Sequence, residues 1–126
     1  LTNTIMFVRN FRDAAGNAAE GVYFTHPYSD GNDANVKNFI SKYKDEYNFA
    51  APMQSYYAWD YTHVLVNALK NNKWKVDNLE NSILKIKEFN GLFGKTVINK
   101  DGDFFTSIGI SVMENGDIKT LKVINS

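Results

Sequence analysis

The sequence predicts a mixed α/β fold, and three observations carry this prediction. A short apolar run bounded by turn residues comes first. Three helical patterns follow, in which apolar residues recur with a period of about 3.6. Beyond Gly91 the pattern changes to the alternation of strands and contains Asn115-Gly116, a strong hairpin signal. With no internal repeat and no linker, we expect one domain, or part of one, built from layered helices and strands.

The composition excludes several classes of site and partner. Fourteen basic residues balance fourteen acidic ones among 126, so no net charge favours nucleic acid or an anionic surface. The absence of cysteine excludes thiolate metal ligation, cysteine nucleophiles and disulfides. No apolar run reaches the roughly 18 residues that span a bilayer. We predict no metal and no cofactor, and we expect a chain that begins at Leu1 to be a processed product or a fragment.

The first part of the chain is predicted to contain short strands and a capped helix. An apolar run at 5–8 indicates one strand. Residues 21–25 are β-branched and aromatic, and they stop at Pro27, which lacks a ladder donor. Turn residues fill 28–35, where Asp33 is a suitable N-cap for the helix that follows.

Three amphipathic helices are predicted next. The last of them opens with a capping-box pattern of Asp77 and Glu80 and ends before Gly91, and Gly94 then opens a strand. The three apolar faces predicted by the spacing are Val36, Phe39, Ile40, Tyr43 and Tyr47; Tyr57, Tyr61, Val64, Leu65, Ala68 and Leu69; and Ile83, Ile86 and Phe89.

The rest of the chain is predicted to form strands. Residues 96–98 make a first strand, and the polar segment 99–103 makes a turn. A long strand at 104–113 is followed by the Asn-Gly turn and by a partner strand at 118–124.

Two constellations could carry chemistry. Asp60 and His63 lie three residues apart on a predicted helix and could form an acid/base pair, although no nucleophile motif accompanies them. Asn99, Asp101 and Asp103 alternate like the start of a calcium loop, but the later glycine and bidentate acid are missing, so a tight turn explains them better. We therefore predict no catalytic residues.

An aromatic cluster lies at the start of the second predicted helix. Tyr57 and Tyr61 share the apolar stripe, which favours core packing. Tyr56 and Trp59 fall off that stripe, so they either decorate the surface or form the wall of a pocket.

The order of these motifs resembles the periplasmic binding proteins for branched-chain amino acids, which are type I solute-binding proteins of ABC importers. The likeness covers nearly the whole chain from Gly16 onward, whereas Thr62-His63 and the segment before Gly16 depart from the family pattern. The motifs are Gly-Asn-Ala-Ala-Glu-Gly-Val-Tyr-Phe-Thr at 16–25, the spaced aromatics Phe39, Tyr43 and Tyr47, Pro52, the helix with Tyr57-Ala58 and Tyr61, Phe89 with Gly91 and Gly94, Thr96-Val97-Ile98, Asp101-Gly102-Asp103 and the hairpin with Gly116.

The resemblance implies two Rossmann-like α/β lobes with a ligand held between them, of which this chain matches the carboxy-terminal third. About 1–27 and 104–126 would be second-lobe strands and crossovers, and about 35–98 would be first-lobe helices and a strand. The chain would thus contain three helices followed by a strand and a C-terminal β-hairpin.

The resemblance also implies a function. The chain would belong to an extracellular solute-binding component of an ABC importer, with a branched-chain or similar amino acid facing Tyr56, or Tyr57 if the register shifts by one. His26, Pro27 and Tyr28 would lie at the hinge. A membrane permease would be the partner. The solute-binding protein would be periplasmic or extracellular, and a lipid anchor is one way in which the intact protein would be attached to the membrane. The isolated chain would self-associate. The alternatives are a sensor module of the same fold and a small α/β enzyme that uses Asp60 and His63.

Overall fold

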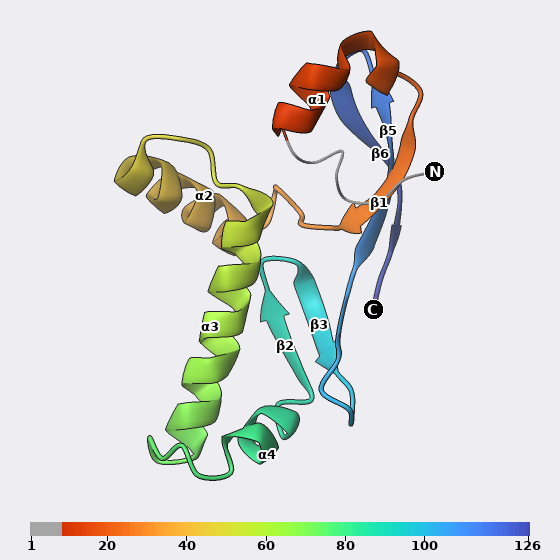
Figure 1. The fold of residues 1–126 in the computed structure, drawn as a ribbon. Coiled ribbons are helices and arrows are strands. Elements are labelled where there is room, and N and C mark those ends of the chain that lie inside the picture. Colours follow the sequence, from red (N-terminus) through yellow and green to blue (C-terminus); the bar gives the residue numbers. More distant parts are fainter. Residues whose placement is uncertain (1–8) are drawn as a thin grey trace. The chain divides into compact units, whose positions relative to one another are not determined.

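The computed structural model describes residues 9–126 and confirms the mixed α/β class (Figure 1). The chain divides into two compact units. The first unit comprises the chain up to Tyr28 together with Ser107–Ser126, and the second comprises Ser29–Thr106. The strand predicted at 5–8 lies outside the described residues.

The first unit is a small antiparallel sheet with two short helices. Its strands lie in the order β1-β5-β6, with a register shift in the β5–β6 pair between Ile110 and Ser111. The buried side chains of Ala19, Phe24 and Met113 form its core. The elements are α1 (Arg9–Ala15), the 3-10 helix η2 (Gly16–Ala19), β1 (Tyr23–Pro27), β5 (Ile108–Glu114) and β6 (Asp117–Ile124).

Strand β1 begins and ends two residues later than predicted, at Tyr23 and Pro27. Pro27 is tolerated because it is the last residue of a strand at the edge of this sheet. The helices α1 and η2 were not predicted, since their small residues show no apolar period. The hairpin prediction is confirmed, because Asn115 (φ 56°) and Gly116 (φ 79°) both have the positive φ of a type I′ turn.

The second unit combines three helices with a second antiparallel sheet, ordered β2-β3-β4. Its core is formed by Val36, Phe39 and Leu92. The predicted cap is confirmed, since Asp33 Oδ1 accepts hydrogen bonds from the backbone N–H groups of Asn35 and Val36. The elements are α2 (Ala34–Tyr47), α3 (Met53–Asn71), α4 (Leu79–Leu84), β2 (Glu88–Gly91), β3 (Gly94–Ile98) and β4 (Phe104–Thr106).

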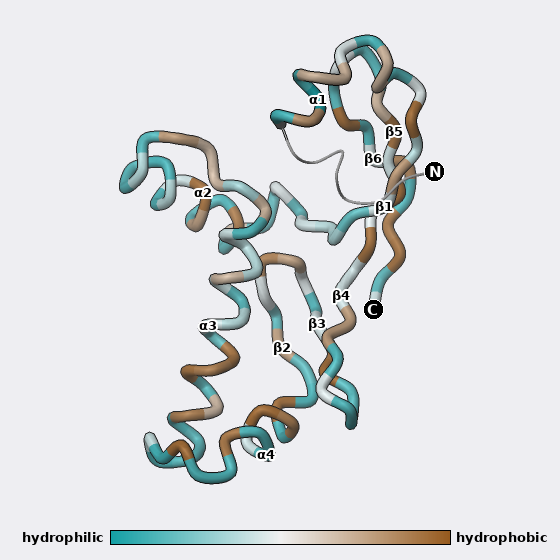
Figure 2. The backbone as a smooth tube through the Cα atoms, in the orientation of Figure 1, coloured by the Kyte–Doolittle hydropathy of each residue, from teal (hydrophilic) through white to brown (hydrophobic). Residues whose placement is uncertain are grey.

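The predicted apolar face of α3 is wrong in part. The hydrophobic residues of this helix alternate with hydrophilic ones along the chain (Figure 2). The buried residues are Asp60, Val64 and Ala68, whereas Tyr61 is 49% exposed and Leu65 is 41% exposed. The Asp60 carboxylate can lie on the buried face because backbone N–H groups donate hydrogen bonds to it there. The spacing of apolar residues gives no sign of such a contact.

The third predicted helix is much shorter than expected. Helix α4 ends at Leu84, so Phe89 lies in strand β2. The capping box of Asp77 and Glu80 is not formed: the residue before the helix is Asn78, whose φ of 58° is left-handed, and no side chain caps the helix. The carbonyl of Asp77 instead accepts a hydrogen bond from the side-chain amide of Asn72 at 2.6 Å.

One strand prediction is wrong, and another is incomplete. The single strand expected at 104–113 is interrupted at Ser107, so β4 pairs with β3 in the second unit and β5 pairs with β1 in the first. Gly91 and Gly94 are opposite each other across a hairpin whose turn is Leu92-Phe93, and β2 is an additional strand. The second unit therefore holds a three-stranded sheet and not a lone strand.

Candidate functional site

The turn between β2 and β3 is held by a buried carboxylate from α3. Asp60 is only 3% exposed, and its Oδ1 accepts a hydrogen bond from the N–H of Leu92 at 2.8 Å. Burial raises the pKa of Asp60, while backbone hydrogen bonds from Leu92 and Phe93 and the neighbouring His63 lower it. A Cβ on Gly91 would lie 2.4 Å from Asp60 Oδ2, so the close approach of helix and turn needs glycine there.

The carbonyls of the same turn are held by the first and last residues of the second unit. The hydroxyl of Ser29 donates to the Leu92 carbonyl at 2.5 Å, and the hydroxyl of Thr106 donates to the Phe93 carbonyl at 3.0 Å. Both passages of the chain into and out of this unit are therefore fixed to one turn.

The two predicted ligand-facing residues, Tyr56 and Tyr57, meet on the ring of Phe93. The Tyr56 centroid lies 5.8 Å from Phe93 and 5.0 Å from Phe39, and the Tyr57 centroid lies 4.7 Å from Phe93. Both tyrosines are half-buried on the first turns of α3. Burial raises the pKa of each, so the two hydroxyls remain protonated donors at neutral pH.

Asp60 and His63 engage different partners. Asp60 bonds to the β2–β3 turn, whereas exposed His63 places Nδ1 2.8 Å from the carbonyl of Trp59. The imidazole also packs on the Trp59 ring, with 4.4 Å between centroids. No hydrogen bond joins this pair among the described residues, so the geometry does not assemble the hypothetical acid/base dyad.

The residues predicted for a hinge lie at the end of β1. His26 is buried, with Nδ1 2.9 Å from the Pro27 carbonyl and Nε2 2.9 Å from Ser111 Oγ. Burial lowers the pKa of His26 and the hydrogen bond to Pro27 opposes this shift. Tyr28 is the last residue of its segment, and its N–H donates to the carbonyl of Ser107 at 2.8 Å.

The polar loop at 99–103 is the predicted tight turn. Asn99 Oδ1 accepts hydrogen bonds from the N–H groups of Asp101 and Asp103, at 2.9 and 2.8 Å. The Asn99 side chain therefore stabilises the turn through its own backbone.

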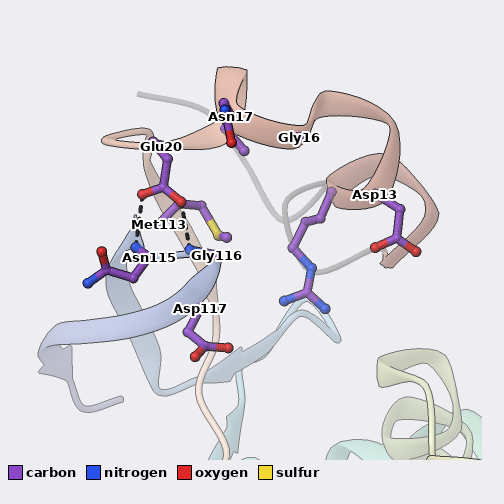
Figure 3. A pocket seen from close by; sticks show the side chains of 10 residues that line it. Asp13, Gly16, Asn17, Glu20, Met113, Asn115, Gly116 and Asp117 are labelled. Atoms are coloured by element: carbon purple, nitrogen blue, oxygen red, sulfur yellow. Dashed lines mark hydrogen bonds between the residues drawn. The ribbon is translucent and has the colours of Figure 1, made fainter.

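A hollow of about 840 Å³ lies in the first unit (Figure 3). One wall comes from α1 and η2, and the other comes from the tip of the β5–β6 hairpin. Glu20 bridges the walls, since its carboxylate accepts hydrogen bonds from the N–H groups of Asn115 at 2.9 Å and Gly116 at 2.6 Å. The hollow is lined by Arg12, Asp13, Gly16, Asn17, Ala19, Glu20, Met113, Asn115, Gly116 and Asp117.

Some residues that build these sites carry no signal in the sequence. Ser29 and Thr106 act through single hydroxyls on backbone carbonyls, and such bonds follow no spacing rule. Gly91 offered a hint, because an isolated glycine beside a strand often marks a close approach of another backbone or side chain.

Solved structures of solute-binding proteins are similar to the chain. Leucine-binding protein LivK from Thermotoga maritima matches with a TM-score of 0.77 and 26% identity, over 92% of this chain and 34% of that one. The LivJ protein of Streptococcus pneumoniae, solved with isoleucine, matches with a TM-score of 0.74 and 25% identity, over 91% and 33% of the two chains. A solute-binding protein of R. palustris, solved with benzoate, matches with a TM-score of 0.71 and 16% identity, over 89% and 32%.

These matches decide the fold. The chain is part of a type I solute-binding-protein fold. The resemblance predicted from the sequence is thus confirmed, and the chain spans about a third of the length of these solute-binding proteins. No protein-family model and no curated protein sequence matches it. Within residues 9–126, the structure contains no helix long and apolar enough to cross a membrane.

Proposed function

We propose that the chain is the carboxy-terminal part of the solute-binding component of an ABC importer, and that the ligand is a branched-chain or similar amino acid. The match to LivK and LivJ over about nine tenths of this chain supports the proposal. About 1–27 and 104–126 would belong to the second lobe, and about 35–98 to the first. The complete protein would act in the periplasm or outside the cell and deliver its ligand to a membrane permease.

The tyrosine pair on Phe93 is the observation that carries the site proposal. Tyr56 would pack against the apolar side chain of the ligand, with Tyr57 as the alternative. Half-burial leaves part of each ring accessible, and the protonated hydroxyls can donate hydrogen bonds. The Leu92-Phe93 turn, on which the tyrosine pair packs, is held from both sides. Asp60 accepts a hydrogen bond from its amide side, and the hydroxyls of Ser29 and Thr106 donate to its carbonyls. A preorganised wall of this kind lowers the entropic cost of binding.

We also propose that His26, Pro27 and Tyr28 lead into a hinge. The hydrogen bond from Tyr28 to Ser107 ties the two chain passages together on one side of the unit boundary. Ser29 and Thr106 are anchored on the other side. Rotation about the backbone between these anchors would leave all three hydrogen bonds intact, which is what a hinge of a few residues requires.

Calorimetry on the protein in its full natural length tests the ligand class. Leucine, isoleucine and valine are titrated beside 4-hydroxybenzoate, because aromatic acids are bound by other proteins of this fold. We expect at least one of the three amino acids to bind. Binding of the aromatic acid alone would reject the amino-acid proposal, and binding of none of the four would reject both ligand classes.

Substitution of the tyrosines tests the site. Tyr56→Ala should weaken binding by about 1–3 kcal/mol, because it removes apolar contact with the ligand. Tyr47→Ala is the matched control, since Tyr47 is 56% exposed on α2 and should leave the affinity unchanged. If neither Tyr56→Ala nor Tyr57→Ala changes the affinity, the tyrosine pair is not the ligand wall.

A further inference from the structure

The Asn115-Gly116 turn carries a reactive dipeptide whose amide is held by a distant carboxylate. The two residues occupy the central positions of the turn between β5 and β6, and both are exposed. Figure 3 shows the Glu20 carboxylate hydrogen-bonded to both of their N–H groups. The bond to Gly116, at 2.6 Å, is shorter than the bond to Asn115, at 2.9 Å. Glu20 lies 95 residues from Asn115 in the sequence, so the contact depends on the fold.

An asparagine followed by glycine can react with its own backbone. The Gly116 nitrogen would attack Cγ of the Asn115 side chain, so that an N–Cγ bond forms and the bond from Cγ to the side-chain nitrogen breaks. The proton lost by the Gly116 nitrogen leaves with the departing group as ammonia. Water then opens the succinimide ring to aspartate or isoaspartate, and no oxidant or reductant is involved. Glycine permits this attack because no side chain shields its nitrogen.

The Glu20 carboxylate opposes the first step in two ways. The attacking nitrogen must lose its proton, and a negative charge beside it disfavours the amide anion that results. The nitrogen must also turn toward Cγ, and this breaks a charge-assisted hydrogen bond. Water itself is not limiting, because Asn115 lines the open hollow of the first unit.

We propose that Asn115 is a deamidation site and that the Glu20 carboxylate protects it by slowing formation of the succinimide. The site is independent of the ligand proposed above. Once the reaction has occurred, the contact with Glu20 is weakened: an aspartate or isoaspartate at 115 adds a carboxylate next to Glu20 and Asp117, and like charges so close repel. Isoaspartate also lengthens the turn by one backbone carbon, which removes the type I′ geometry.

The chain contains its own reference site at Asn90-Gly91. Asn90 is exposed like Asn115, but it lies in β2, and Gly91 pairs with Gly94 in the strand ladder. The nearby Asp60 carboxylate bonds to Leu92 and not to Gly91. Loss of Glu20 should therefore leave the rate at Asn90 unchanged.

A matched variant is available in the same hairpin. Glu114→Gln makes the same chemical change as Glu20→Gln and breaks the ion pair of Glu114 with Lys119, in which Oε2 and Nζ are 2.7 Å apart. It leaves the hydrogen bond from the Gly116 N–H to the Glu20 carboxylate in place. The deamidation rate at Asn115 in this variant measures the effect of a general loosening of the hairpin.

The experiment follows deamidation over time at neutral pH. The unchanged chain, Glu20→Gln, Glu20→Ala and Glu114→Gln are incubated in heavy-oxygen water, which labels each succinimide that is opened during the incubation. Peptide mass spectrometry then gives the rates at Asn115 and Asn90. We expect Glu20→Gln to raise the rate at Asn115 by about tenfold, the factor typical of a lost charge-assisted hydrogen bond. Glu20→Ala should raise it at least as much, with Asn90 unchanged throughout.

Three results would overturn the proposal. An unchanged rate at Asn115 in Glu20→Gln means that the carboxylate gives no protection. A slower rate means that it acts as a base for the attack. An equal acceleration in Glu114→Gln, or an equal acceleration at Asn90, assigns the effect to loosened structure.

Discussion

At the scale of single residues, Asp60 shows how a polar side chain acquires a structural role. The same carboxylate that could pair with His63 on the helix surface is buried and bonded to the Leu92 N–H. Its desolvation raises its pKa, and the backbone hydrogen bonds partly offset this cost. Asp60 stabilises the fold because it accepts hydrogen bonds from N–H groups of the turn that would otherwise be buried without a partner.

Asp60→Ala should lower the free energy of unfolding by about 1–3 kcal/mol, because it leaves buried N–H groups of the turn unsatisfied. His63→Ala, three residues away and exposed, should cost no more than about 1 kcal/mol. Urea denaturation followed by circular dichroism measures both. Equal effects of the two substitutions would show that the turn does not depend on this carboxylate.

His26 should make stability depend on pH. Burial lowers its pKa in the folded chain below the ordinary 6.5. At pH values between the folded and the unfolded pKa, the unfolded chain binds more protons than the folded chain. The contribution of neutral His26 to the free energy of unfolding is therefore complete above about pH 6.5 and is lost as the pH falls below that value.

Denaturation followed between about pH 7.5 and about pH 5, on both sides of the unperturbed pKa of 6.5, measures this slope. His26→Gln should flatten it, because it removes the buried imidazole. A slope that survives in His26→Gln would place the responsible group elsewhere.

At the scale of elements, local signals were the ones that could be predicted. Asp33 caps α2 and Asn-Gly closes the β5–β6 hairpin because a side chain or a backbone angle within a few residues decides the structure. Strand β2 could not be predicted, since Phe89 follows Ile83 and Ile86 at a spacing that also suits a helix. Only the pairing with β3 decides between the two.

Gly91→Ala should destabilise the β2–β3 hairpin. The new Cβ would lie 2.4 Å from Oδ2 of the buried Asp60 carboxylate. That carboxylate cannot move away without losing the hydrogen bond that its Oδ1 accepts from the Leu92 N–H. Overpacking of this kind costs about 1–3 kcal/mol in the free energy of unfolding. Gly31→Ala is the control, because a Cβ there meets nothing within 4 Å. If both variants have the same denaturation midpoint, the close approach is not a constraint.

At the scale of the whole molecule, the sequence led to the site through resemblance more than through physical pattern. Tyr56 and Tyr57 were singled out in this way, and the structure brings both onto Phe93. The anchors Ser29 and Thr106 were not found, because their partners are backbone carbonyls that any residue could supply. Long-range hydrogen bonds to backbone leave no trace in composition or period.

We predict that the chain associates with itself in solution. Large apolar side chains such as Leu65 and Tyr61 on α3 are 41% and 49% exposed, and exposed apolar surface promotes association. Light scattering during size-exclusion chromatography should show a mass that rises with concentration. Leu65→Glu should reduce this rise, whereas Ser41→Glu on an exposed position of α2 should not. A monomer at every concentration would contradict the prediction.

The Leu92-Phe93 turn has a consequence for hydrogen exchange with solvent. Amides in a two-residue hairpin turn ordinarily face water and exchange within seconds or less, whereas the Leu92 N–H is buried and bonded to Asp60. Its deuterium uptake should therefore wait for the opening of the second unit as a whole, as for a core strand. A turn that would normally be among the first parts of a chain to take up deuterium would here be among the last.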